Sequence, residues 1–184
     1  MLYHASPTAG IKTLTPRISN HGEPLIYFSE KRENTLVYLS NAVEKYCRQT
    51  GFKYSGAWEK WATYGFKEGK LILEEYYPNA SELTYSGVSG YIYSVEEDIS
   101  FEPQKDIPHA FISRSSVQTV KSEYIPDAYA ALLSAAEKGH IIIKPYEDNS
   151  PEKLRWIRET IKKEYDSALA HPEYRYFLKK HFDL

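Results

Sequence analysis

The sequence is poor in cysteine and has no long apolar run, and each shortage narrows the class of protein. A single cysteine, Cys47, among 184 residues excludes a disulfide framework or a cysteine zinc site within the chain. No apolar run approaches the ~20 residues that a membrane-spanning helix needs. The opening residues, MLYHASPT, lack the charged and then apolar pattern of a secretory signal. We therefore expect a cytoplasmic protein with no membrane partner.

Charge and histidine spacing give no sign of a nucleic-acid or metal partner. The 23 basic and 25 acidic side chains leave a net charge of −2, so no excess of cations exists to hold a phosphate backbone non-specifically. The six histidines show neither a His-x₃-His nor a His-Glu-x₂-His spacing. The nine glycines are scattered and form no phosphate-binding loop. We expect no metal site.

Tyrosine is abundant, at 17 of 184 residues. Its ring is flat and apolar and ends in a polar group, which suits the wall of a pocket for a flat polar ligand. Tyrosine is also common in β-strands. Composition alone leaves both interpretations open.

Hydrophobic periodicity and turn residues predict strands first and helices last. The predicted strands fall at 2–4, 25–28, 90–95, 109–112, 117–124 and 140–144, with a hairpin formed by 61–66 and 71–76. The predicted helices cover 30–49, part of 78–88, and segments beginning at Pro126, Ser150 and Pro172. This order predicts an α+β domain with a mainly antiparallel sheet. We expect residues 1–148 to form it and 149–184 to be a helical extension packed on it.

One stretch carries an ordered set of polar and aromatic residues. Tyr3-His4-Ala5-Ser6 lies on the first predicted strand, Tyr27-Phe28-Ser29 on the second, and Tyr38, eleven residues after Tyr27, on the following helix. This order resembles the His-Tyr-Glu group of ADP-ribosyltransferases, which includes diphtheria-type toxins, poly(ADP-ribose) polymerases and rifamycin-modifying transferases. Ser19-Asn20 and GYIYSVE at 90–96 resemble segments of the rifamycin-modifying branch. The resemblance covers residues 2–125.

The resemblance implies a split antiparallel β-sheet core with flanking helices, a C-terminal helical tail, and NAD as substrate. Tyr27 and Tyr38 would sandwich the nicotinamide ring through stacking and cation–π attraction. His4 would orient the ribose, and the main chain around Ala5 would hold the carboxamide. The remaining implied NAD-binding residues are Ser6, Ser29 and, from charge alone, Arg17 or Arg114 at the pyrophosphate.

Cleavage of the nicotinamide–ribose bond passes through an oxocarbenium-like state that a carboxylate stabilises. In the family this group usually lies near a late strand, where residues 114–118 offer only Gln118. The acidic loop after GYIY supplies Glu96, Glu97, Asp98, Glu102 and Asp106, of which we favour Glu102. The expected catalytic residues are therefore His4, Tyr38 and Glu102.

Three functions stay open at this point. The first is NAD-dependent transfer of ADP-ribose to an unknown acceptor, a protein, nucleic acid or small molecule, with release of nicotinamide. The second is a binding module for NAD or ADP-ribose with a degenerate site, which the absence of an acid near Gln118 favours. The third is an unrelated interaction domain in which the Tyr-His-Ala-Ser turn is coincidental.

Overall fold

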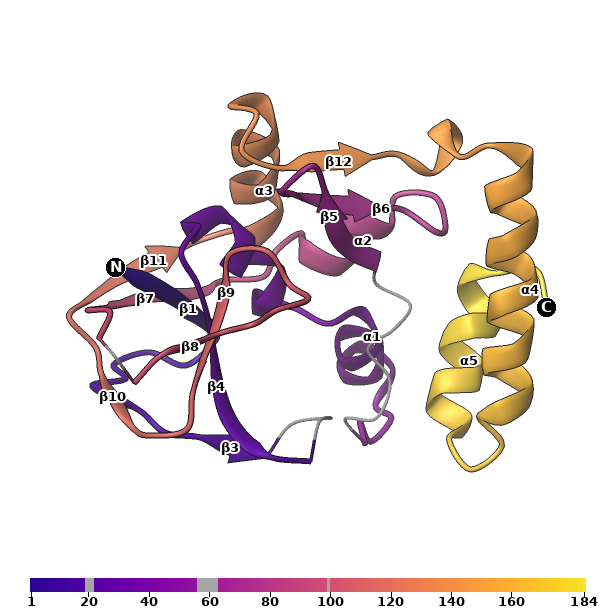
Figure 1. The fold of residues 1–184 in the computed structure, drawn as a ribbon. Coiled ribbons are helices and arrows are strands. Elements are labelled where there is room, and N and C mark those ends of the chain that lie inside the picture. The colour runs from indigo at the N-terminus through magenta and orange to yellow at the C-terminus, as the bar shows by residue number, and fades with distance from the viewer. Residues whose placement is uncertain (19–21, 56–62, 99) are drawn as a thin grey trace.

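The computed structural model describes residues 1–18, 22–55, 63–98 and 100–184 (Figure 1). In this part of the chain, three β-sheets are combined with helices, so the predicted α+β class is confirmed. Ser19 and Asn20 lie outside the described residues, as do Trp61 and Ala62 of the predicted hairpin.

The central sheet has seven strands in the order β11-β7-β1-β4-β9-β8, with β3 paired to β4. Every strand pair in it is antiparallel. The strands are β1 (Leu2–Ser6), β3 (Arg17–Ile18), β4 (Pro24–Ser29), β7 (Gly90–Val95), β8 (Glu102–Pro103), β9 (Ala110–Ser113) and β11 (Lys121–Ile125). The two segments that carry the Tyr-His and Tyr-Phe-Ser motifs are therefore neighbours in the middle of the sheet.

The junction of β1 and β4 differs from the rest of the sheet. β1 is paired with β7 along all five of its residues, whereas its register with β4 is a single pair, Tyr3 with Ser29. Beyond that pair, a side chain joins the two strands. The Nδ1 atom of His4 lies 2.8 Å from the carbonyl oxygen of Tyr27.

Two smaller sheets flank the central one. The predicted hairpin is present as β5 (Thr63–Lys67) and β6 (Lys70–Glu74), and β12 (Ile142–Lys144) adds to β6 in parallel. The predicted strand over 117–124 is divided in two. Its first part is β10 (Val117–Gln118), which pairs with β2 (Thr13–Leu14), and only its second part, β11, joins the central sheet.

The single helix expected over 30–49 is wrong. The segment forms a 3₁₀ helix, η1 (Arg32–Leu39), and an α-helix, α1 (Ala42–Thr50), separated by extended backbone at Ser40. The side chain of Asn41 accepts a hydrogen bond from the Glu44 amide and so begins a new helix. Ser29 does not cap η1. Its hydroxyl oxygen accepts from the Lys31 amide in a local turn.

The remaining helices are α2 (Ala80–Tyr85), α3 (Ala128–Glu137), the 3₁₀ turn η2 (Tyr146–Asp148), α4 (Pro151–Ser167) and α5 (Pro172–His181). Two of them, α3 and α4, begin at a side-chain cap. Asp127 accepts from the Ala130 amide at the start of α3, and Ser150 accepts from the Lys153 amide at the start of α4. Pro151 follows Ser150 at the first helical position, where its missing N–H costs no hydrogen bond.

Apolar side chains form three buried clusters. The first lies between the central sheet, η1, β6 and α3 and includes Ala5, Leu36, Ile92 and Leu132. The second joins α1 to the C-terminal helices and includes Val43, Cys47, Ile157 and Phe177. The third contains Leu2, Phe28, Val95 and Phe101. Because α4 and α5 share a core with α1, they are a packed layer of the molecule at one end of the sheets (Figure 1).

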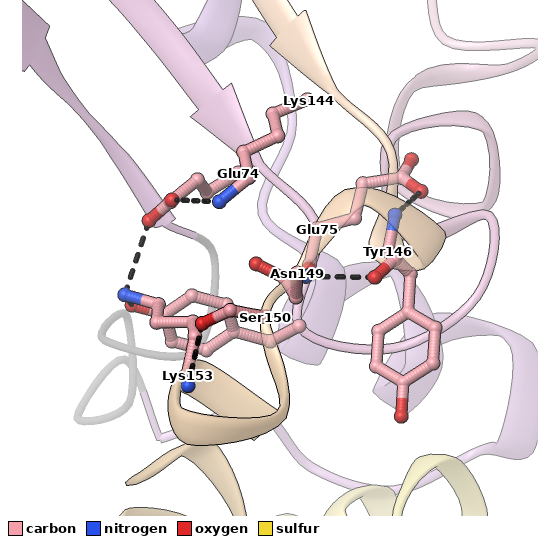
Figure 2. A network of polar contacts seen from close by, with 8 residues as sticks. Glu74, Glu75, Lys144, Tyr146, Asn149, Ser150 and Lys153 are labelled. Carbon is pink, nitrogen blue, oxygen red and sulfur yellow. Dashed lines mark hydrogen bonds and ion pairs between the residues drawn. The ribbon is translucent and has the colours of Figure 1, made fainter. Parts of the chain in front are cut away.

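A polar network ties that layer to the end of β6 (Figure 2). The Glu74 carboxylate lies 2.9 Å from Lys144 Nζ and 3.2 Å from Lys153 Nζ. Its neighbour Glu75 is buried and accepts hydrogen bonds from the main-chain amides of Ser81 and Tyr146. Two adjacent acidic residues thus bond to different elements, Glu74 to α4 and Glu75 to the main chain of α2 and η2.

Candidate functional site

The two faces of the central sheet carry different parts of the predicted site. Successive side chains of a strand point to opposite faces. On β4, Ile26 and Phe28 belong to the third cluster, so Tyr27 and Ser29 face the other side. On β1, Ala5 belongs to the first cluster, against η1 and α3. Tyr27 therefore lies on the face covered by η1, the element that carries Tyr38.

His4 lies at the junction of β1 and β4 with its ring against Phe28, at 5.8 Å between ring centroids. Burial lowers its pKa, against the raising effect of the Tyr27 carbonyl and together with the lowering effect of the Arg17 charge. The ring is therefore neutral at pH 7. Since a carbonyl oxygen only accepts, Nδ1 carries the hydrogen and Nε2 is left as an acceptor.

Tyr38 has a neighbour that the sequence did not indicate. Its ring lies edge-to-face with that of Tyr64 on β5, with centroids 5.6 Å apart and planes at 81°. Both rings are partly open to solvent, with Tyr38 49% and Tyr64 38% exposed. Tyr27 is half-buried. The exposed aromatic surface at this place thus comes from η1 and the β5–β6 hairpin together.

The other predicted NAD-binding residues lie around the same junction in mostly local roles. Ala5 is buried and pairs with Ile92 of β7. The Ser6 hydroxyl accepts from the Thr8 amide at 3.2 Å, and the buried Ser29 is held by its own turn. Arg17 is exposed on β3, close enough to His4 for its charge to lower the pKa of that imidazole. The structure therefore places these residues on β1, β3 and β4, with Ala5 and Ser29 on the face covered by η1 and Ser6 on the other face.

Glu102 lies elsewhere. It is on β8 at the edge of the sheet, with β9 and β4 between it and β1, or about 14 Å at the usual strand spacing. Its carboxylate accepts from Arg114 Nε at 3.1 Å, and the same guanidinium donates to Glu23 at 2.7 Å. Gln118 is likewise occupied, since its side-chain oxygen accepts from the Thr13 hydroxyl. The structure does not bring either residue beside His4.

A carboxylate that sequence reasoning missed is Glu30, the residue that follows Ser29 at the end of β4. Its main-chain amide donates to the His109 carbonyl at 3.0 Å, and its carboxylate bonds to His109 Nδ1. The other ring nitrogen of His109 lies 3.0 Å from the Gly69 carbonyl in the turn of the β5–β6 hairpin. The signal available in the sequence was an acid directly after Tyr27-Phe28-Ser29.

The backbone of His109 is unusual, because its φ of 64° lies in the left-handed region that residues with a side chain rarely adopt. Such conformations cost of order 1 kcal/mol or more and persist only where the surroundings fix them. Here the ring is fixed from both sides, by Glu30 and by Gly69. Glu30 and His109 therefore form a rigid polar pair that connects β4, β9 and the hairpin.

A second charged pair fixes the start of η1. Arg32 Nε donates to Glu123 Oε2 at 2.8 Å and Arg32 Nη2 to Oε1 at 2.6 Å, a two-point contact across the face of the sheet. Glu123 on β11 is in register with Ile92 on β7, which is in turn in register with Ala5 on β1. The hydrogen bond from Arg32 holds the pKa of Glu123 below its usual range. This pair anchors η1 near the strand that carries His4.

Within the described residues, no group of three or more histidine, cysteine, aspartate or glutamate side chains is placed to hold a metal ion. The helices formed by those residues are all too short or too polar to cross a membrane. Neither a family model, nor a curated protein, nor a solved structure matches this chain. Its function has to be inferred from its own residues.

Proposed function

We propose that this chain binds NAD at the junction of β1 and β4 and transfers ADP-ribose to an acceptor, releasing nicotinamide. The observation that supports this most directly is the His4 imidazole bonded to the main chain of Tyr27, on strands whose backbone pairing is a single residue pair. NAD lying across the junction would meet Tyr27 and Tyr38 on one side and the Nε2 acceptor of His4 on the other.

The chemistry assigns a separate role to each group. The tyrosine rings favour the flat, cationic nicotinamide by stacking and cation–π attraction. The bond between the nicotinamide nitrogen and ribose C1′ breaks, and its electron pair leaves with nicotinamide. C1′ then bonds to the acceptor nucleophile, whose proton passes to a base. A carboxylate beside C1′ stabilises the positive charge in between.

Glu30 replaces Glu102 as our candidate for that carboxylate. It follows Ser29, whose Cα lies in register with Tyr3 on one side and Ala110 on the other, so it is at the same end of the sheet as the motif. Its bond to His109 holds the carboxylate in one orientation. Glu102, in contrast, neutralises Arg114 at the far edge.

One observation favours the second candidate function, NAD or ADP-ribose binding without transfer. Glu30 is engaged by His109, Glu102 by Arg114 and Glu123 by Arg32. If these pairs persist when NAD is bound, none of these three carboxylates is available to the ribose, and the site holds the ligand without cleaving it.

The two functions are separated by measuring nicotinamide release and the thermal shift with NAD in parallel. Release above the uncatalysed rate supports the transferase, and a shift without release supports the binding module. Tyr38→Ala removes the nicotinamide release of a transferase or the thermal shift of a binding module. Tyr176→Ala, which deletes a similarly exposed ring on α5, leaves both intact. In the transferase, Glu30→Gln lowers release about 10²–10³-fold. If the parent chain shows no nicotinamide release and no thermal shift with NAD, NAD is refuted as the ligand.

A further inference from the structure

A cavity between α1, α2 and α5 has the composition of a second ligand site. It encloses about 270 Å³ and shares no lining residue with the junction of β1 and β4. Four rings line it, those of Tyr46, Tyr77, Phe177 and His181. Three charged side chains line it as well, Lys45, Lys180 and Glu82. The C-terminal helix α5 thus contributes part of the wall.

The rings form a continuous aromatic surface. The His181 ring stacks on Tyr77 at 4.4 Å between centroids and 29° between planes, and it lies 4.7 Å from Phe177 and 6.4 Å from Tyr46. Burial, with a smaller effect of Lys180, lowers the pKa of His181 to about 4. The ring is therefore uncharged near neutral pH and offers a flat apolar face.

The charged groups leave the cavity positive. Lys45 Nζ donates to the Ser86 carbonyl at 2.7 Å, and Lys180 Nζ lies 5.4 Å from the centre of the Tyr46 ring. Among the described residues, neither ammonium group forms a salt bridge with a carboxylate, although the charge of Asp127 acts on Lys45. Burial lowers the pKa of Lys45, and the charge of Asp127 offsets this effect only in part. Two cations face one carboxylate, Glu82.

We propose that this cavity binds a flat heteroaromatic anion, the chemistry shared by a nucleoside monophosphate and an aromatic carboxylate. The ring would lie on His181, which is itself stacked on the buried Tyr77. The anionic group would lie between Lys45 and Lys180, where each charge-assisted hydrogen bond is stronger than a neutral one. For a ligand such as AMP, Glu82 would accept from the exocyclic amino group of the base. The volume is near the lower end of small-molecule sites, which fits a ligand of this size.

Calorimetric titration of the full chain with AMP and, separately, with nicotinate tests the site. We expect saturable binding of at least one of them, with AMP alone indicating a nucleotide and nicotinate alone an aromatic acid. Lys180→Met weakens the affinity about tenfold. Lys179→Met removes the same charge from the neighbouring position of α5, outside the cavity, and leaves the affinity unchanged. Absence of binding by both probes, or an equal loss in the two variants, overturns the proposal.

Two further measurements place the bound molecule. Saturation with the probe that binds shifts the nuclear magnetic resonances of the His181 ring, because a stacked ring lies in direct contact with it. The Tyr38→Ala variant binds the probe as the parent chain does, since Tyr38 is not among the residues that line this cavity. Saturable binding without a His181 shift, or binding lost in Tyr38→Ala, puts the ligand elsewhere and refutes this site. Failure of NAD binding leaves these results unaffected.

Discussion

Replacing Gly90 with alanine tests how closely η1 packs on the central sheet. Gly90 begins β7, and its backbone is not in the left-handed region, so alanine introduces no backbone strain. A methyl group on Gly90 would meet Leu39 Cδ2 at 2.5 Å, the Ser6 carbonyl oxygen at 3.1 Å and Pro7 Cα at 3.5 Å. The first distance is far inside van der Waals contact, and Leu39 is itself buried.

The cost follows from those contacts. Overpacking by one methyl group in a well-packed interior typically costs 1–3 kcal/mol, and the loss of glycine's freedom in the unfolded chain returns about 0.5 kcal/mol. We therefore expect Gly90→Ala to reduce the free energy of unfolding by about 1–2 kcal/mol. For a chain of this length that is a fall of about 3–6 °C in the melting temperature.

Denaturant unfolding of a matched pair of variants measures this effect. Gly65 lies exposed in β5, and a methyl group there would meet nothing within 4 Å, so Gly65→Ala is neutral or slightly stabilising. In the double variant Gly90→Ala/Leu39→Ala the new methyl group enters space left by the leucine, and the combined loss is about 1 kcal/mol smaller than the sum of the single losses. Equal stability of Gly90→Ala and Gly65→Ala would show that η1 does not pack against β7 at this point.

Three other variants test the caps, the polar network and the buried imidazole. Asp127→Ala removes two backbone hydrogen bonds and costs about 1 kcal/mol in urea unfolding. Because those bonds lower the pKa of Asp127 from 3.8, their contribution to stability is present above pH 3.8 and is lost as the pH falls below that value. Lys153→Met removes an ion pair to Glu74 and costs about 1 kcal/mol, less at high salt. The pKa of His181 is lowered from 6.5 to about 4, so acidification across that range destabilises the chain by about 1–2 kcal/mol after allowance for solvent screening. His181→Phe removes this dependence of stability on pH. An unchanged pH dependence in the variant contradicts the burial of a neutral His181.

The parts of the fold that the sequence predicts well are those specified by neighbouring residues. The start of α4 is predicted because Ser150 and Pro151 are adjacent and act on the same helical turn. The strand at 90–95 is predicted because its apolar residues are continuous. The break at Ser40 is not, because the apolar period passes through it unchanged. At that break the local cap of Asn41 is joined by a distant contact, the hydrogen bond from the Ser40 hydroxyl to the Thr84 carbonyl.

In the candidate site too, positions set by neighbouring residues are predicted and contacts between distant residues are not. The sequence places Tyr27 on a strand and Tyr38 on the helical element that follows, and the structure has them there. The pairing of Glu30 with His109 joins residues 79 positions apart, and that of Glu102 with Arg114 depends on how two short strands meet. Residue types give no information on such pairs until the strand order is known. The proposed carboxylate was therefore the least predictable member of the candidate site.

The chain's lone thiol offers a built-in reporter on the attachment of the C-terminal layer. Cys47 is 1% exposed beneath α5, and burial, with the charges of Glu173 and Glu44, raises its pKa. A thiol-specific reagent can modify it only when the packing of this cluster opens. The modification rate in the native chain thus measures that opening without an engineered residue. A ligand bound between α1 and α5 would slow that rate in proportion to its occupancy.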